Sequence, residues 1–206
     1  MKLKWNGHSC FTLKFENGTT IVTDPFDPSV GYVCPEDETD FVTVSHHHHD
    51  HDYTDSLRGG KLVTDKAGVY ELGGIKVSAI KSYHDDAQGK KRGENLIFKF
   101  EYNGISIVHL GDIGHYPDAE QLKFISGADV MLIPVGGFYT IDTDTALKTV
   151  KAAQPKLAIP MHFKTPEINF PISDEKRFAK QTAAVYVNAR EIEPGALSGA
   201  MVLNYK

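Results

Sequence analysis

Cysteine is scarce in this chain of 206 residues, which contains only Cys10 and Cys34. Two thiols are too few for the disulfide framework of a small secreted domain, so we expect reduced cysteines that serve as small packing residues. The chain also lacks an apolar run of about 18 residues, the length that a membrane-spanning helix needs. Its first residues lack the long apolar stretch of a signal peptide. These absences predict a soluble, cytoplasmic protein.

An excess of positive charge is missing as well. Lysine and arginine total 22 against 27 aspartate and glutamate residues, and the formal net charge is −5. Nucleic-acid footprints are strongly basic, so this balance argues against a nucleic-acid partner. The consecutive cations Lys90, Lys91 and Arg92 are interpreted as a solvated loop. We expect a small-molecule substrate as the partner, and the composition leaves a homo-oligomer open.

Neither a low-complexity linker nor an internal repeat divides the sequence. The chain is 41% hydrophobic and 24% charged, and its length suffices for one sizeable core. We therefore expect one domain over residues 1–206.

Short alternating or apolar runs separated by turn residues fill the first half of the chain. Such runs are typical of β-strands joined by hairpins. The expected strands are residues 11–15, 19–23, 41–44, 61–64, 68–72, 75–80, 95–102 and 105–109. The expected tight turns are Asn17-Gly18, Gly73-Gly74 and Asn103-Gly104.

The second half alternates strands with helices. Residues 117–126 fit a helix with Pro117 in its first turn and Gly127 at its C-terminal end. A second helix is expected from a cap at Asp142 or Thr143 through residue 153, and a third after a cap at Ser173. Strands are expected at residues 130–135, 156–162 and 200–205. Strands first and strand–helix units later predict a layered α/β protein with at least one mixed sheet.

The tract from Ser45 to Asp52 is the most informative segment, because five of the ten histidines and Asp50 occupy six consecutive positions in it. Imidazole binds zinc, copper, iron or nickel, and a carboxylate widens that choice to harder ions. The tract is internal and follows the apolar residues 41–44, unlike a terminal expression tag. In extended backbone, residues two apart point the same way. The spacing alone leaves two ligand sets open: His46, His48 and Asp50, or His47, His49 and His51.

The order His46-x-His48-x-Asp50-His51 is similar to the His-x-His-x-Asp-His signature of the metallo-β-lactamase superfamily. Three later residues stand where that family's other ligands are expected, each at the end of an apolar run: His84, Asp112 and His162. The resemblance covers the whole chain. Other segments resemble the branch that includes the ascorbate-6-phosphate lactonases: Gly7-His8-Ser9-Cys10-Phe11, Thr23-Asp24-Pro25-Phe26 and Ile133-Pro134-Val135-Gly136-Gly137. One departure is that His47 and His49 fill the variable positions of the signature.

The resemblance implies a four-layer αββα sandwich, in which two mixed sheets face each other with helices outside. It implies two divalent metal ions, with zinc favoured and manganese or iron compatible. The implied ligands of one ion are His46, His48 and His84. Those of the other are Asp50, His51 and His162. Asp112 would bridge the two ions.

The same resemblance implies a dinuclear hydrolase that uses a metal-bound hydroxide to cleave an ester, lactone or phosphodiester bond. Asp50 would be the catalytic residue that orients the hydroxide and takes its proton. Three other functions are alternatives to this hydrolase. A flavodiiron enzyme is disfavoured because His48 stands where that group has glutamate, and a nucleic-acid phosphodiesterase because of the acidic balance. A non-catalytic metal-binding module is less compatible with a complete ligand set.

Several further polar residues have roles that the sequence leaves open. Asp24 is interpreted as a hydrogen-bond partner of a ligand imidazole, with an Asp-Pro turn as the alternative. His109 is interpreted as a core histidine. His8 and His115 are undecided between structural roles and contacts to the site or substrate. Gly136-Gly137 is either a simple turn or a place where backbone N–H groups approach an anionic substrate.

Overall fold

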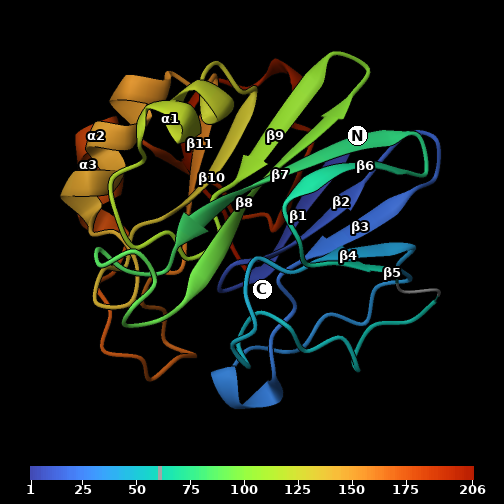
Figure 1. Ribbon diagram of the computed structural model, residues 1–206, viewed down its shortest axis with the longest axis horizontal. Coiled ribbons are helices and arrows are strands. Elements are labelled where there is room, and N and C mark those ends of the chain that lie inside the picture. The colour runs from blue at the N-terminus through green and yellow to red at the C-terminus, as the bar shows by residue number, and fades with distance from the viewer. Residues whose placement is uncertain (60–61) are drawn as a thin grey trace.

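Two mixed β-sheets make up most of the structure, a computed structural model that describes residues 1–59 and 62–206 (Figure 1). The six-stranded sheet has the order β13 (Glu191–Ile192), β1 (Lys2–Gly7), β2 (Cys10–Lys14), β3 (Thr20–Thr23), β4 (Phe41–Thr43) and β5 (Leu62–Thr64). The eight-stranded sheet has the order β12 (Val185–Tyr186), β14 (Gly199–Val202), β11 (Leu157–Met161), β10 (Val130–Pro134), β9 (Ile105–His109), β8 (Glu94–Tyr102), β7 (Ile75–Tyr83) and β6 (Gly68–Leu72).

Strand direction follows the length of each connection. Tight turns join β1 to β2 and β2 to β3, and these pairs are antiparallel, as are the successive pairs from β6 to β9. Longer connections lead to the parallel pairs β3–β4 and β4–β5 in one sheet and β9–β10, β10–β11 and β11–β14 in the other. A parallel neighbour requires the chain to return to the same edge, which a two-residue turn cannot do.

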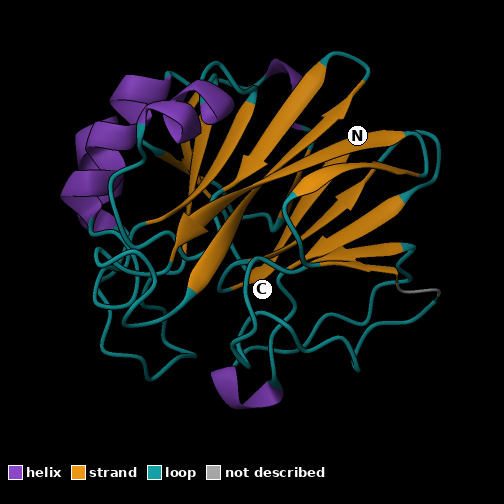
Figure 2. Ribbon diagram, in the orientation of Figure 1, coloured by secondary structure: helices purple, strands orange, loops and turns teal. Residues whose placement is uncertain are grey.

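Three α-helices lie together beside the eight-stranded sheet, on the side of β10 and β11 (Figure 2). They are α1 (Ala119–Ile125), α2 (Thr143–Ala153) and α3 (Lys176–Thr182). Helix α2 packs against both other helices, and α3 also contacts β14. Within residues 1–59 and 62–109 the structure contains strands, turns and one short 3₁₀ turn (Pro28–Val30), so the helical layer comes from the second half of the chain.

The inner faces of the two sheets share one hydrophobic core. Trp5 and Phe11 from the six-stranded sheet belong to the same buried cluster as Phe98, Phe100 and Ile107 from the eight-stranded sheet. Each of these side chains is at most 1% exposed. Fully burying one large apolar side chain stabilises a fold by about 1.5–3 kcal/mol, so this interface is what holds the sheets face to face. Cys10 and Cys34 are both free, as expected.

Several expected boundaries were wrong. Helix α1 begins at Ala119, because Asp118 is its N-cap: the Asp118 carboxylate accepts a hydrogen bond from Gln121 N at 2.9 Å, and Gln121 Oε1 accepts one from Asp118 N at 3.0 Å. Pro117 therefore precedes the helix. Ser173 does not cap α3, whose N-cap is Glu175; Ser173 N donates instead to Gly136 O at 2.7 Å.

The strands also differ in detail from those expected. Strand β1 was not expected, and β7 runs on to Tyr83, three residues past its predicted end. The last strand ends at Val202. The expected strand at 61–64 is described from Leu62, and Lys61 lies outside the described residues. In the described part of the chain, no helix combines the length and apolarity needed to cross a membrane.

The shared core generates a stability prediction. Phe98→Ala should lower the free energy of unfolding by about 3–5 kcal/mol, because it removes a ring that is 1% exposed at the interface between the sheets. Val69→Ala is the matched control, since Val69 is 71% exposed on a strand of the same sheet, and should cost less than about 1 kcal/mol. Urea unfolding measures both values. Equal effects of the two substitutions would contradict this description of the core.

Candidate metal centre

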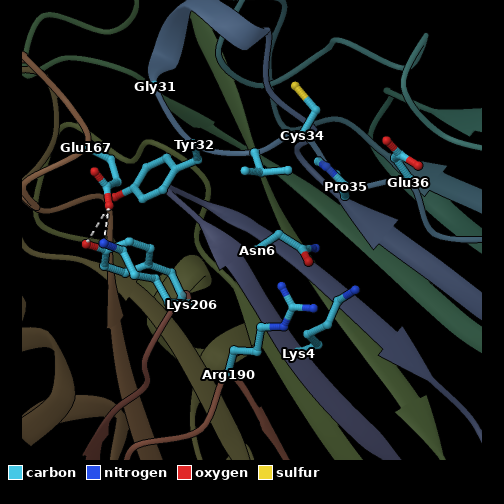
Figure 3. Close-up of a pocket in the computed structure, with 12 residues that line it drawn as sticks. Lys4, Asn6, Gly31, Tyr32, Cys34, Pro35, Glu36, Glu167, Arg190 and Lys206 are labelled. Atoms are coloured by element: carbon cyan, nitrogen blue, oxygen red, sulfur yellow. Dashed lines mark hydrogen bonds and ion pairs between the residues drawn. The ribbon is translucent and has the colours of Figure 1, made fainter.

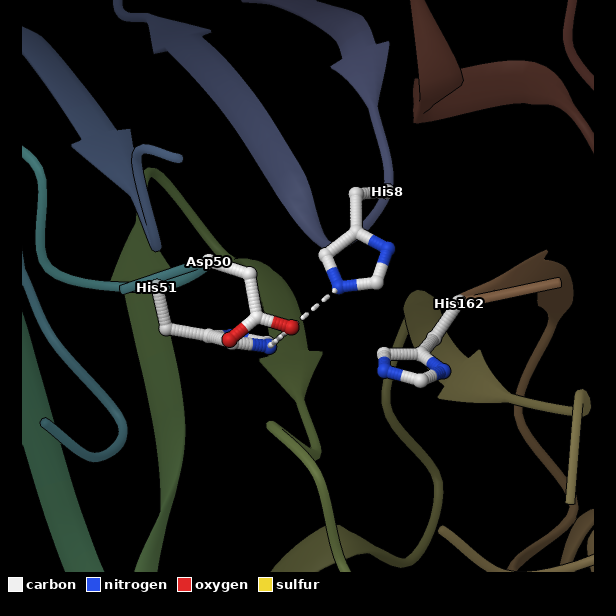
Figure 4. Close-up of side chains that lie close together, drawn as sticks. All are labelled: His8, Asp50, His51 and His162. Carbon is white, nitrogen blue, oxygen red and sulfur yellow. Dashed lines mark hydrogen bonds and ion pairs between the residues drawn. The ribbon is translucent and has the colours of Figure 1, made fainter. Parts of the chain in front are cut away.

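Loops that follow four strands meet at one edge of the sandwich. The chain leaves β4 before His46, β7 before His84, β9 before Asp112 and β11 before His162. The turn between β1 and β2 brings His8 to the same place (Figure 4). Carboxyl ends of strands are the usual position for ligand sites in sheet proteins. The three isolated residues expected from the ends of apolar runs are therefore brought together with the histidine tract.

The tract itself divides into buried and exposed members. His46 is 7% exposed and His51 is fully buried. The side chains of His47 and His49 are each 63% exposed, and His47 pairs with Asp52 and Asp65 at 3.3 Å. The backbone here is turned rather than extended, because His51 N donates to His48 O at 2.8 Å. The assumption of a two-residue alternation was thus wrong, and the turn is what carries His51 back into the interior.

Potential metal ligands form three overlapping groups among the described residues. Within each group the ligand atoms lie within 4.8 Å of one another. The groups are His46, His48 and His84; His46, His51 and Asp112; and His8, Asp50, His51 and His162. All seven ligands that the sequence analysis expected belong to these groups, and His8 joins them. His47 and His49 belong to none.

Asp112 lies at the centre of the cluster. Its Oδ2 atom is 3.3 Å from His51 Nε2, 3.4 Å from His84 Nε2 and 3.0 Å from His162 Nε2. Burial opposes ionisation of this carboxyl, but the neighbouring His162 and His51 outweigh it and hold the pKa of Asp112 well below its usual value. One oxygen of an ionised carboxylate therefore faces imidazoles from both expected ligand sets.

The charge of the cluster favours a cation. Burial lowers the pKa of His51, but Asp112 and Asp50 outweigh that effect and raise it well above the usual value. The carboxylates thus create a local field strong enough to hold a positive charge on a fully buried ring. Burial, reinforced by His51, keeps the pKa of His46 well below its usual value, and burial lowers that of His84. Neutral imidazoles of this kind can ligate a metal at neutral pH.

Asp24 and Ser45 fix the orientation of two ligand rings. Asp24 Oδ2 accepts hydrogen bonds from His51 Nδ1 at 2.9 Å and from Ser45 Oγ at 2.6 Å. The Ser45 hydroxyl has one proton, which it donates to Asp24, so it accepts a hydrogen bond from His46 Nδ1 at 3.0 Å. Each ring therefore has its Nδ1 proton in a hydrogen bond, and Nε2 is the atom of each ring that faces the cluster. The partnership expected between Asp24 and a ligand imidazole is present.

The Nε2 atoms of His46 and His51 test whether the residues of the cluster fit a metal ion. His46 Nε2 and His51 Nε2 are buried and have no hydrogen-bond partner among the described residues. A buried polar atom without a partner costs about 1–3 kcal/mol, so such atoms require an explanation. A divalent cation in the cluster accounts for both, because both atoms face the carboxylate-rich centre and an imidazole nitrogen releases its proton when it binds a metal. The donor set fits a metal.

His8 lies within the cluster, beside Asp50, His51 and His162. It is fully buried, and its ring centre is 4.2 Å from that of His162. Burial, together with the nearby His162, lowers the pKa of His8 to about 4. The ring is neutral at pH 7, and its Nε2–H donates to Asp50 Oδ2 at 3.1 Å. In Figure 4 the side chains of His8, Asp50, His51 and His162 converge.

A cavity of about 280 Å³ opens onto the cluster. Its lining comprises His48, His49, Asp50, His84, Arg92, Asp112, Tyr139, His162 and Phe170. Lys90, Lys91 and Arg92 lie on a loop, as expected, and the two lysines are exposed, but Arg92 is partly buried in the cavity wall; Phe170 was not expected there. Both lie on loops, where no periodic pattern reports a side chain's direction.

A larger cavity of about 480 Å³ lies elsewhere and contains none of the metal-group residues (Figure 3). Two of its cations are already neutralised. Lys4 Nζ lies 2.6 Å from Asp37 Oδ2, and Lys206 Nζ lies 2.6 Å from Glu167 Oε1. This cavity is large enough for a ligand, but its lining lacks the metal-group residues that line the smaller cavity.

Comparison with known proteins decides the family. The sequence pattern of the β-lactamase superfamily domain matches residues 2–162. A UPF0173 metal-dependent hydrolase from Thermoplasma acidophilum is 32% identical, over 94% of this chain and 96% of the relative. The chain belongs to the metallo-β-lactamase superfamily. It is a metal-dependent hydrolase of that fold.

Solved structures of the metallo-β-lactamase superfamily agree with the fold. A candidate Zn-dependent hydrolase from Thermotoga maritima superposes with a TM-score of 0.82 at 35% identity, covering 98% of this chain and 97% of that one. An isothiocyanate hydrolase from Delia radicum gut bacteria has a TM-score of 0.72 at 14% identity, covering 100% and 97%. At that identity the second likeness extends to the fold alone.

Two histidines near this metallo-β-lactamase centre are structural. His109 Nε2 donates to Ser9 O at 2.8 Å, and its Nδ1 accepts from Gly111 N at 3.1 Å, which confirms the core interpretation. His115 Nδ1 donates to Tyr116 O at 2.9 Å, and its Nε2 accepts from Tyr83 N at 3.3 Å. Both nitrogens of each ring are used by backbone, so neither ring is available to a substrate.

The glycine pair after β10 has a packing function. A Cβ atom at Gly136 would lie 2.2 Å from the carbonyl oxygen of the expected ligand His162, so only glycine permits this approach. Gly137 N donates to Ile141 O at 3.2 Å within the same loop. This N–H is therefore committed and does not serve as a donor to an anionic substrate.

The division of the tract predicts different effects of neighbouring substitutions. His46→Ala should lower metal content, because it removes a buried nitrogen that points into the cluster. His47→Ala and His49→Ala should retain metal near the wild-type level, since neither ring belongs to a group of potential ligands among the described residues. Elemental analysis of the purified variants measures this. Loss of metal in His47→Ala with retention in His46→Ala would show that the other ligand set is used.

The partners of Asp24 generate a second prediction. Asp24→Asn should weaken metal binding by about 10- to 100-fold, because the amide has one acceptor oxygen, whereas the carboxylate accepts from His51 and Ser45 Oγ on one oxygen and from Ser45 N on the other. Competition with a chromophoric chelator measures the affinity. Asp27→Asn is the control, since Asp27 is a partly exposed N-cap of the 3₁₀ turn Pro28–Val30 whose carboxylate accepts from Ser29 N. Equal affinities of the Asp24→Asn variant and wild type would rule out this orienting role.

Proposed function

We propose that the chain is a dinuclear hydrolase that cleaves an ester, lactone or phosphodiester bond in a small molecule. The observation that carries the proposal is the position of Asp112 Oδ2, within 3.4 Å of His84 on one side and of His51 and His162 on the other. A carboxylate there can serve two cations and offset their mutual repulsion. The cavity of about 280 Å³ supports a small substrate.

Zinc is the metal we propose, with manganese or iron as the alternatives. The donor groups contain more imidazoles than carboxylates, which suits zinc, whereas the central carboxylate is also compatible with harder ions. Two bound divalent cations would lower the pKa of a water molecule and stabilise negative charge that develops on the substrate.

Asp50 would act on the attacking water in this proposal. Burial opposes its ionisation, but His51 and His8 outweigh burial and hold the pKa of Asp50 well below its usual value, so it is ionised at neutral pH. Its Oδ2 accepts the hydrogen bond from His8, which fixes the carboxylate in the cavity wall. Asp50 can then orient the water and receive its proton, while the neutral His8 holds Asp50 in place.

Removing the central carboxylate tests the proposal. Asp112→Ala should lose bound metal and reduce hydrolysis by more than about 100-fold, and His48→Ala should act in the same direction. Metal is counted per chain by elemental analysis, and activity is screened on lactones, phosphodiesters and thioesters after metal is restored. Asp52→Ala is the matched control, because Asp52 lies in the same tract but, within residues 1–59 and 62–206, pairs only with the exposed His47.

Two results would contradict the proposal. Fewer than two metal ions per fully loaded wild-type chain would exclude a dinuclear centre. Full metal content and full activity in Asp112→Ala would show that the central carboxylate holds neither ion.

A further inference from the structure

Arg92 is a cation without a counter-ion in the wall of the cavity. It is half-buried, and no carboxylate among residues 1–59 and 62–206 lies within 4 Å of its guanidinium group. Neighbouring lysines are different: Lys91 Nζ lies 2.6 Å from Asp86, and Lys81 Nζ lies 2.9 Å from Glu94. A partly desolvated guanidinium retains five N–H donors that favour a carboxylate or phosphate.

The loop that carries Arg92 is fixed to the metal centre. The Asp85 carboxylate accepts hydrogen bonds from four backbone N–H groups, including those of Lys91 at 2.9 Å and Arg92 at 2.8 Å. Asp85 directly follows the expected ligand His84, whose own N–H donates to Gly93 O at 3.1 Å. These hydrogen bonds attach the backbone of residues 91–93 to the His84–Asp85 segment. The fold therefore sets the position of the Arg92 backbone relative to the cluster.

Aromatic rings complete this side of the cavity. The Arg92 guanidinium carbon lies 5.6 Å from the ring centre of Tyr139, within the range of a cation–π contact. The ring centres of Tyr139 and Phe170 are 6.1 Å apart. Phe138 stands beside Tyr139, is 63% exposed and has a φ of +60°, a strained conformation for a bulky residue. Strained residues of this kind concentrate at functional sites.

We propose that Arg92 binds an anionic group of the substrate at a point remote from the bond that is cleaved. The substrate class is a hydrolysable small molecule that carries a carboxylate or phosphate, with its organic part against Tyr139 and Phe170. The inference rests on the proposed hydrolase function. Arg92 lines the same cavity as Asp50 and Asp112, and among the described residues it forms no ion pair with either carboxylate, so its donors can serve an anionic group of the substrate.

A pair of matched esters tests the preference. One is 4-nitrophenyl hydrogen adipate, whose chain is too long for ready attack of its own carboxylate on the acyl carbon, and the other is its methyl ester, in which the free carboxylate is capped. In both, water adds to the acyl carbon, the bond to the phenolic oxygen breaks, and 4-nitrophenol is released. Wild type should favour the free carboxylate in kcat/KM by about 10- to 100-fold, the range of a charge-assisted bidentate contact. Arg92→Gln should lose this preference while cleaving the capped ester within about twofold of wild type.

Binding measurements separate this inference from the hydrolase proposal. Succinate and inorganic phosphate are titrated calorimetrically into metal-loaded wild type, Arg92→Gln and Lys91→Gln, with metal content matched by elemental analysis. The anion that binds wild type more tightly identifies the preferred group, and Arg92→Gln should bind it at least about 10-fold more weakly. Lys91→Gln should match wild type, because its side chain pairs with Asp86 outside the cavity.

The outcomes decide each proposal by itself. Equal affinities of wild type and Arg92→Gln for both anions would overturn the role of Arg92, whether or not the esters are cleaved. Absence of hydrolysis across all substrates, with anion binding still dependent on Arg92, would overturn the hydrolase proposal and leave the anion site standing.

Discussion

A buried carboxylate surrounded by imidazoles is the constraint on which the rest of the structure depends. Asp112 is 1% exposed, and an uncompensated charge at such a position costs several kcal/mol. Three imidazoles from the ends of different strands, or the loops that follow them, approach one of its oxygens. The two sheets must therefore align so that these strand ends meet, and the shared hydrophobic core between the sheets maintains that alignment.

The backbone around Asp112 is shaped for this role. Asp112 N donates to Asn95 Oδ1 at 2.9 Å, and Asn95 Nδ2 donates to Leu110 O at 3.0 Å. A Cβ atom at Gly111 would lie 2.2 Å from the same Asn95 oxygen, so glycine is required there. Residues other than glycine are also forced into left-handed backbone at the site: φ is +51° at His8, +43° at Asp24 and +50° at His162. Each such residue costs about 1–3 kcal/mol, and the clustering of these residues around one charged group favours a functional explanation.

Sequence reasoning succeeded where a local pattern reports a position directly. The resemblance singled out His84, Asp112 and His162, and the apolar runs before them placed them near strand ends, because a buried strand is visible as a hydrophobic run. Periodicity failed within the histidine tract, since the chain turns between His48 and His51. There the resemblance to the family selected the ligand set, and the spacing alone did not.

Other errors had signals that were present in the sequence. Lys2-Leu3-Lys4-Trp5 alternates as a strand should, and β1 buries Leu3 and Trp5 accordingly. The capping box of Asp118 and Gln121 marks the true start of α1. Arg92 and Phe170 are a different case. They reach the cavity through loop closure, and loop closure depends on hydrogen bonds between residues whose proximity no short-range pattern encodes.

The cavity joins residues of the metal groups to a wall that comes from loops. The wall that contains Arg92, Tyr139 and Phe170 comes from loops, which can vary without altering the sheets. In this chain, however, the two ends are not independent. His84 contributes to the metal groups, and the next residue, Asp85, binds the backbone of Arg92. One peptide segment thus sets both the position of an expected ligand and that of the unpaired cation. A change in that loop that moved Arg92 would therefore also displace His84. Changes of substrate preference made through this loop are thus restricted, because they also affect the metal site.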